Sequence, residues 1–156
     1  ITYKLNKNFK ISANYRFTNK RRLDDTYSKR HRYYIDFSYR NKVKPIVLSL
    51  RARFQSQYAD VYSSPEGFVP SYYARYKLRA KYDTDKKVSP YISTEIFTPL
   101  NSHGGFSIDN ARYCAGFEYK INRMKSLEFF YMIQQEYNVN DPVRDYIIGL
   151  AYSFAL

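Results

Sequence analysis

The most constraining feature of the chain is a strict alternation of residue types in the segment YYARYKLRAKY, from Tyr72 to Tyr82. One parity holds tyrosine, alanine and leucine, and the other holds four cations, Arg75, Lys77, Arg79 and Lys81. Successive side chains of a β-strand point to opposite faces of the sheet, so a period of two predicts a strand. A sheet with one basic and one aromatic face fits a nucleic-acid binder, or a barrel with cations inside and lipid outside.

The same period recurs along the whole chain, and helical periodicity appears nowhere. We predict nine strands, at Ile1–Leu5, Phe9–Phe17, Arg30–Arg40, Ile46–Tyr58, Ser71–Tyr82, Tyr91–Phe97, Ala111–Ile121, Ser126–Tyr137 and Tyr146–Phe154. The six prolines fall between these segments or at their edges, where no ladder hydrogen bond is needed. The 156 residues suit a single domain that spans residues 1–156.

The connections between these segments alternate in length. The short ones are residues 6–8, 41–45, 83–90 and 122–125, and the longer ones are residues 18–29, 59–70, 98–110 and 138–145. In an up-and-down meander, successive turns lie at opposite ends, so one rim carries tight turns and the other carries long loops. Outer-membrane barrels have this asymmetry. Two of the short connections share a phrase, YKLNK and YKINR, in which asparagine supplies the turn chemistry.

When the charged parity of each strand is turned inward, the other parity is apolar on most strands. In Ile46–Tyr58, for example, Leu48, Leu50 and Phe54 share one face. We therefore predict an all-β fold, an antiparallel up-and-down transmembrane β-barrel with tyrosines at both membrane interfaces. The last segment, YIIGLAYSFAL, has the alternation of a terminal barrel strand. Because such barrels have even strand numbers, we expect at least one strand before Ile1 and about ten to twelve in all.

Composition supports this class of protein and excludes others. The 26 Lys+Arg against 14 Asp+Glu give a net charge of +12, which suggests an anionic partner. The 19 tyrosines and 11 phenylalanines favour strands and membrane interfaces. A single cysteine, Cys114, excludes an internal disulfide and a cysteine-based zinc cluster. No apolar run is long enough for a membrane-spanning helix, and we expect no cofactor.

The inward parity predicts a charge network in the lumen. Its members are Arg51, Arg53, Arg75, Lys77, Arg79, Glu95, Arg112, Glu118 and Glu128. Buried charges must be paired, and arginine pairs bidentately with carboxylates, so we expect a structural network. The alternative is a selectivity lining for an anionic solute. A second basic cluster in a long outer loop, Lys20, Arg21 and Arg22, suits either lipopolysaccharide phosphates or a solvated loop.

Several phrases resemble an uncharacterised family of Bacteroidota outer-membrane proteins, a domain of unknown function. The phrases are HRYYIDFSYR, LSLRARFQ, PYISTEIF and NARYCAGFEYKI. They carry the family's features at His31 and Arg32, at Arg51, Arg53 and Gln55, at Glu95, and at Asn110 and Arg112. Gln55 stands one place later than in some members. The resemblance covers nearly the whole chain and implies a barrel without implying a reaction.

We therefore expect a small outer-membrane protein without enzymatic activity that acts as a structural or accessory subunit. A larger envelope complex is one setting in which such a subunit would act. Its partners would be outer-membrane lipid, lipopolysaccharide and other outer-membrane proteins, and not nucleic acid. Three alternatives stay open: a narrow channel for small anionic solutes, a membrane-embedded lipid-modifying enzyme, and a soluble binder of single-stranded nucleic acid. The enzyme would use His31 as its base, although a lone histidine at an interface also explains this residue.

Overall fold

The computed structural model describes residues 1–21, 27–58, 70–83, 86–101, 105–122 and 124–154. Its strands are β1 (Thr2–Lys4), β2 (Phe9–Arg21), β3 (Tyr27–Val43), β4 (Ile46–Tyr58), β5 (Ser71–Tyr82), β6 (Val88–Pro99), β7 (Asn110–Lys120), β8 (Lys125–Glu136) and β9 (Arg144–Phe154). In the described part of the chain, no helix is long and apolar enough to span a membrane.

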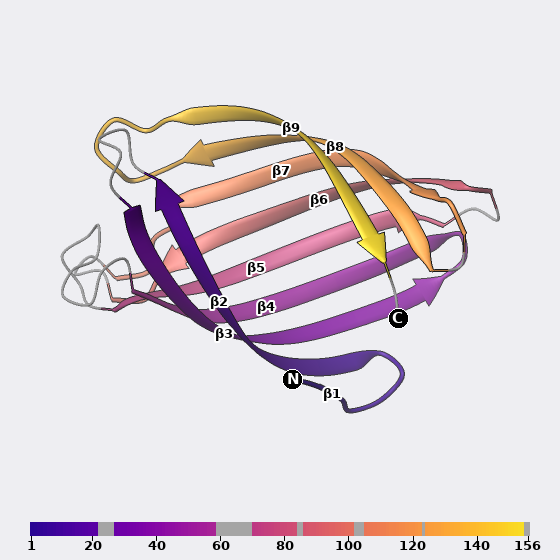
Figure 1. Ribbon diagram of the computed structural model, residues 1–156, viewed down its shortest axis with the longest axis horizontal. Coiled ribbons are helices and arrows are strands. Elements are labelled where there is room, and N and C mark those ends of the chain that lie inside the picture. Colours follow the sequence, from indigo (N-terminus) through magenta and orange to yellow (C-terminus); the bar gives the residue numbers. More distant parts are fainter. Residues whose placement is uncertain (22–26, 59–69, 84–85, 102–104, 123, 155–156) are drawn as a thin grey trace.

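The nine strands form one sheet in the order of the sequence, and every neighbouring pair is antiparallel. The sheet curls strongly, so that β2 and β9 cross in front of the middle strands (Figure 1). Within the described residues, β1 and β9 do not pair with each other, and the sheet is therefore not closed. The all-β, up-and-down meander predicted from the alternation is confirmed.

The strands β2 and β3 are longer than the sequence predicted. Their ladder continues to the pair Arg21↔Tyr27, so the prediction of a loop was wrong for residues 18–21 and 27–29. The reason is that successive residues here, such as Thr18 and Asn19, are polar although they lie on opposite faces. The alternation of residue types therefore disappears while backbone pairing continues. The strands β2, β4, β6 and β8 all end on the same side of the sheet, the left in Figure 1, which we name the loop end. The opposite end is named the turn end.

Proline 90 is also inside a strand, contrary to the expectation that prolines lie outside or at the edges. Pro90 pairs with Phe117 of β7, but the ladder between β5 and β6 ends at Lys81↔Tyr91. Pro90 thus lies just beyond the last pair of the β5–β6 ladder, where its missing N–H interrupts no pairing with β5. This is why the strand tolerates a proline at that position.

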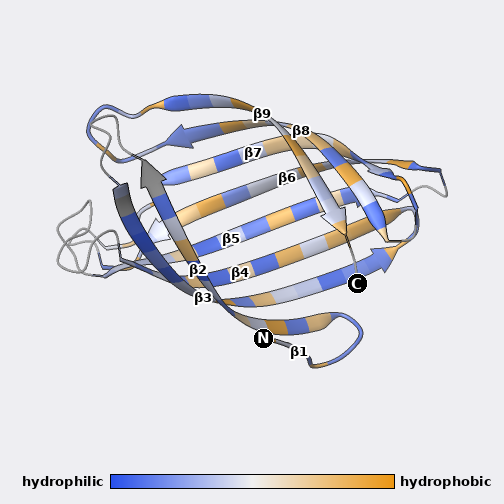
Figure 2. Ribbon diagram, viewed as in Figure 1, coloured by the Kyte–Doolittle hydropathy of each residue, from blue (hydrophilic) through white to orange (hydrophobic). Residues whose placement is uncertain are grey.

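The register places the charged parity of each strand on the concave face and the apolar parity on the convex face. Ile92 and Ile148 on the convex face are 65% and 77% exposed, whereas Arg75 and Glu95 on the concave face are only 7% and 6% exposed. Among the described residues, only four apolar side chains are buried: Val47, Ala74, Tyr91 and Ala111. Bands of alternating hydropathy run along the strands (Figure 2). This distribution is the reverse of that in a water-soluble domain.

Aromatic side chains of the convex face contact one another near both ends of the strands. At the turn end, the ring centroids of Phe9 and Tyr39 are 4.6 Å apart. At the loop end, those of Tyr15 and Tyr33 are 5.1 Å apart, and Tyr33 meets Tyr58 edge to face at 6.3 Å. Such pairs stabilise neighbouring strands beyond the area that they bury.

The two short turns with a shared phrase have the same hydrogen bonds. The side-chain oxygen of Asn6 accepts the backbone N–H groups of Asn8 and Phe9, both at 2.8 Å. That of Asn122 accepts the N–H groups of Met124 at 2.9 Å and Lys125 at 2.8 Å. Asparagine thus closes both hairpins by the turn chemistry that the sequence predicted.

Candidate functional site

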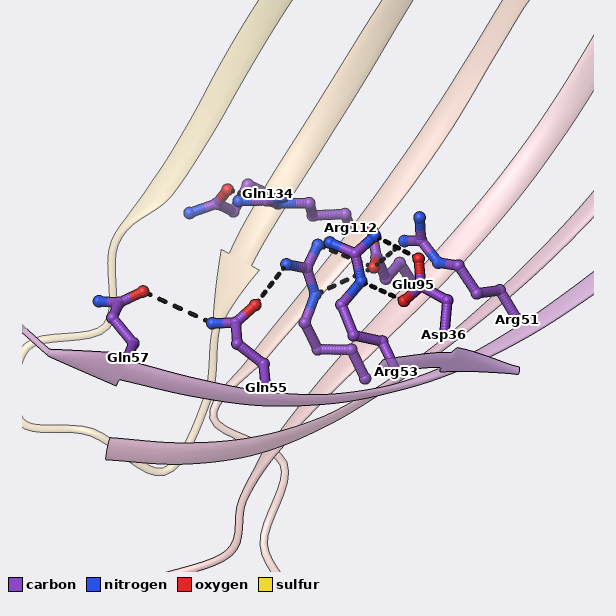
Figure 3. A network of polar contacts seen from close by, with 9 residues as sticks. Asp36, Arg51, Arg53, Gln55, Gln57, Glu95, Arg112 and Gln134 are labelled. Atoms are coloured by element: carbon purple, nitrogen blue, oxygen red, sulfur yellow. Dashed lines mark hydrogen bonds and ion pairs between the residues drawn. The ribbon is translucent and has the colours of Figure 1, made fainter. Parts of the chain in front are cut away.

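The concave face of the sheet holds a charge network, and one of its buried ion pairs joins β3 to β4. Arg53 donates from Nε to Asp36 Oδ1 at 2.6 Å and from a terminal nitrogen to Asp36 Oδ2 at 2.8 Å. Both side chains are about 10% exposed. The two parallel bonds match the planar guanidinium to the carboxylate, the strongest geometry available to such a pair. Figure 3 shows this pair in the middle of the network.

Glu95 of β6 holds two arginines at once. Its Oε1 lies 2.7 Å from a terminal nitrogen of Arg51 and 2.8 Å from one of Arg75. On the neighbouring strands, Lys77 stands opposite Glu95 on one side and Arg112 on the other. One carboxylate is therefore surrounded by four cations, and its charge is needed to keep them together in a nearly dry interior.

Neutral amides extend the network toward the loop end. Arg75 donates to Gln55 Oε1 at 3.1 Å, and Arg32 donates from Nε and Nη2 to Gln57 Oε1 at 3.0 and 2.6 Å. Arg112 Nε donates to Gln134 Oε1 at 2.8 Å. These amides satisfy guanidinium donors without neutralising their charge, so this part of the interior stays positive.

At the turn end, two carboxylates bridge strands that are not neighbours in the sheet. Arg79 lies 3.5 Å from Glu128 and Lys81 lies 3.2 Å from Glu118. These contacts join β5 to β8 and to β7 across the concave face, and the curl of the sheet brings β5 and β8 close enough for the first of them. The curl of the sheet is therefore fixed partly by these charges.

Asp83, directly after β5, accepts hydrogen bonds from two lysines of other hairpins. Lys42 Nζ lies 2.6 Å from Oδ2 and Lys120 Nζ lies 2.9 Å from Oδ1. These two bonds hold the pKa of the Asp83 carboxyl well below its usual range. The three residues tie together the ends of β3, β5 and β7.

Aromatic rings on the concave face carry guanidinium groups. The Arg53 guanidinium lies 3.9 Å from the centroid of Tyr34, and that of Arg79 lies 3.7 Å from Tyr91. Arg75 lies 4.2 Å from the Phe97 centroid. Cation–π contacts of this kind help to hold a desolvated guanidinium in one position. The interior is therefore packed by rings and charges together.

The structure brings together most of the residues predicted for the lumen network. Arg51, Arg53, Arg75, Arg79, Glu95, Glu118 and Glu128 form ion pairs within the described residues. Two predicted members, Lys77 and Arg112, make no ion pair within the described residues. Arg112 donates a hydrogen bond to Gln134 instead of pairing with a carboxylate. The prediction omitted Asp36, Asp83, Gln57 and Gln134. Their inward parity was the only available signal, and it applied to Asp36, Gln57 and Gln134 but not to Asp83, which follows its strand.

The predicted lipopolysaccharide cluster lies outside what the structure describes. Arg22 is not among the described residues, and nothing is described of the side chains of Lys20 and Arg21, whose backbone belongs to the end of β2. No group of three or more histidine, cysteine, aspartate or glutamate side chains in the described ranges could hold a metal ion.

His31, the residue weighed as a catalytic base, lies away from the charge network. Its Nδ1 is 2.8 Å from the Tyr15 hydroxyl, and its ring centroid is 5.1 Å from that of Phe17. The register pairs His31 with Phe17 on β2 and with Tyr58 on β4, all three on the convex face. The histidine therefore belongs to the group of aromatic side chains that contact one another on the convex face at the loop end.

Comparison with known proteins assigns the chain to a family. No curated protein and no solved structure matches the chain. Residues 1–145 match the family described as "Protein of unknown function (DUF2490)". This range covers the charge network and the strands from β1 to β8. The chain therefore belongs to the DUF2490 family.

Proposed function

We propose that the protein is a small β-barrel of the bacterial outer membrane, as its likeness to Bacteroidota proteins implies. In this proposal it has no enzymatic activity and acts as a structural or accessory component of the envelope. Lipid and lipopolysaccharide surround its convex face, and other outer-membrane proteins are its candidate partners. The charge network fills the interior and holds the wall together.

The observation that carries the proposal is the inverted distribution of side chains. Large apolar residues such as Ile92 and Ile148 are mostly exposed, while Arg53, Arg75 and Glu95 are at most 9% exposed. In water this arrangement would expose apolar surface and bury charge, and both are unfavourable. In lipid the same arrangement is favourable. The strands β2–β9 have 11 to 17 residues, enough to cross a bilayer, which needs about 9–11 in a tilted strand.

The same distribution argues against binding of single-stranded nucleic acid. Such binders stack bases on aromatic rings beside cations that hold the phosphates, so both must share one surface. In this sheet the tyrosines of β5, such as Tyr72 and Tyr76, lie on the convex face, whereas Arg75 and Arg79 lie on the concave face. A ring that does lie on the concave face, Tyr91, is already covered by the guanidinium group of Arg79, so it is not free to stack with a base.

A channel for small anions is the second candidate, since cations outnumber carboxylates on the concave face. The middle of the interior is nevertheless occupied by side chains of Asp36, Arg53, Arg75 and Glu95, each no more than 9% exposed. We expect no steady conductance in planar bilayers. A steady anion current that disappears in the Arg75→Gln/Arg79→Gln variant would favour the channel.

The main test is location and solvent preference. The full chain, expressed with its native export signal, should sediment with the outer membrane in a density gradient and should require detergent for extraction. Soluble recovery without detergent would contradict the proposal. Lipid A analysis of a deletion strain tests the remaining alternative, a lipid-modifying enzyme. If the protein were such an enzyme, the deletion strain and a His31→Ala strain would both lack a lipid A product. The structural proposal predicts an unchanged lipid A profile in both strains.

A further inference from the structure

The turn end of the interior contains a cavity of about 400 Å³ whose wall is strongly basic. Six cationic side chains line it: Lys10, Arg40, Arg51, Lys77, Arg79 and Lys81. Glu118 is the single carboxylate of its described lining. The volume falls in the range of about 300–1,000 Å³ that is usual for small-molecule sites.

The strand register explains why the cations converge. Lys10, Ser38, Arg51 and Lys77 stand opposite one another on β2, β3, β4 and β5, which makes one transverse row. Arg40, Ser49 and Arg79 form the next row toward the turns. Side chains directly opposite on neighbouring strands have Cβ atoms about 4.5–5.5 Å apart, so Arg51 and Lys77 repel each other across the ladder.

The carboxylates in the described part of the chain do not neutralise this cluster. Glu95, Glu128 and Glu118 pair with Arg51, Arg79 and Lys81, respectively, and Glu95 is shared with Arg75.

Three of the lining cations, Lys10, Arg40 and Lys77, make no ion pair within the described residues. Lys77 is attracted by Glu95 but repelled by Arg51 and Arg79. In addition, the buried Nε of Arg51 has no hydrogen-bond partner there. A buried donor without a partner is unusual and points to a group that completes the site.

We propose that this turn-end cavity binds a soluble phosphorylated small molecule. A phosphoryl group carries up to two negative charges and three acceptor oxygens, which suit guanidinium and ammonium donors. The hydroxyls of Ser38 and Ser49 lie between the cations of the two rows and are further donors. The cavity is on the concave face and not on the lipid-facing one, so the occupant reaches it from water at the turn end.

The test measures binding of inorganic pyrophosphate to the purified full chain in detergent by isothermal titration calorimetry at constant ionic strength. We expect saturable binding to the unaltered protein and a loss of affinity of at least about tenfold in Lys77→Gln, the equivalent of one charged contact. The matched control is Lys29→Gln, the same change on an exposed lysine near the loop end, which should bind within about twofold of the unaltered protein.

The Lys77 variant also has a signature that a purely structural role would not give. Removing this charge relieves the cost of burying it and its repulsion with Arg51 and Arg79, which together outweigh the attraction of Glu95. The melting temperature of the ligand-free protein should therefore stay equal or rise, while pyrophosphate no longer raises it. Absence of saturable binding, equal affinity in Lys77→Gln, or an equal loss in Lys29→Gln would each overturn the proposal. Displacement of pyrophosphate by phosphatidic acid in the micelles would overturn the assignment of a soluble ligand. Because binding is measured in detergent, its failure would leave the proposed outer-membrane location standing.

Discussion

Glu95→Gln should be the most damaging single change in the interior. The substitution keeps the size of the side chain but removes the charge that Arg51 and Arg75 share at 2.7 and 2.8 Å. The side chain of Arg75 is 8% exposed, so it cannot recover its lost partner from water, whereas that of Arg51, at 27%, recovers part. Breaking a buried ion pair costs about 3–5 kcal/mol, and we expect a loss of that size in the free energy of unfolding.

The matched control is Glu118→Gln, which makes the same change at a more exposed pair. The side chains of Glu118 and Lys81 are 21% and 13% exposed, and a loss of about 1–2 kcal/mol is expected. Urea unfolding of the protein in lipid vesicles, followed by far-UV circular dichroism and by the fluorescence of the 19 tyrosines, measures both losses. In an Arg75→Gln background, Glu95→Gln should cost about 1–3 kcal/mol less, because one cation that needs it is absent. Equal losses for Glu95→Gln and Glu118→Gln would refute the reasoning.

Two further predictions concern the turn end and the β7–β8 contact. Asp83→Asn should cost about 1 kcal/mol at neutral pH, because the two lysines that Asp83 holds are 49% and 40% exposed and solvent screens them. Because the pKa of Asp83 is lowered in the folded protein, its contribution is complete above the unfolded pKa of about 4 and is lost only as the pH falls through the folded value. The stability difference between unaltered protein and Asp83→Asn should therefore shrink only in strong acid, and a difference that disappears between pH 7 and 5 would contradict this. Gly116→Ala should cost about 1–3 kcal/mol in urea unfolding, since its Cβ would meet the backbone oxygen of Phe129 and the Tyr91 hydroxyl. Gly149→Ala, whose nearest contacts would all be atoms of the movable Phe130 ring, is the milder comparison, and an equal or larger loss there would count against the packing argument.

The sequence predicts the strands and their faces well because both depend on local alternation. The bounds of Ile46–Tyr58 and Ser71–Tyr82 agree with β4 and β5, where one parity is consistently apolar. Alternation fails at the polar ends of β2 and β3, where both faces meet water or polar neighbours. There the length of each strand depends on backbone pairing with the next strand, and the local sequence pattern carries no information on that pairing.

The charge network is predictable as a set of inward residues but not as pairs. The partners Arg79 and Glu128 are on β5 and β8, so their contact depends on how tightly the sheet curls. The lysines around Asp83 meet for the same reason, since three turns converge only in the curled sheet. Arg112 has a carboxylate, Glu95, opposite it in the ladder but bonds Gln134, a choice of side-chain conformation that no spacing reveals.

The central claim is that the convex face meets lipid and the concave face does not. Single cysteines carrying an environment-sensitive dye can test it in vesicles of brominated lipid, whose bromines quench only a dye that touches them. The native Cys114 reports the concave face, and Ala115→Cys in a Cys114→Ser background reports the adjacent convex position. In the same Cys114→Ser background, Ser49→Cys and Leu50→Cys repeat the comparison on β4. We predict strong quenching at positions 115 and 50 and weak quenching at 114 and 49. Equal quenching at adjacent positions, or the opposite alternation, would contradict the account.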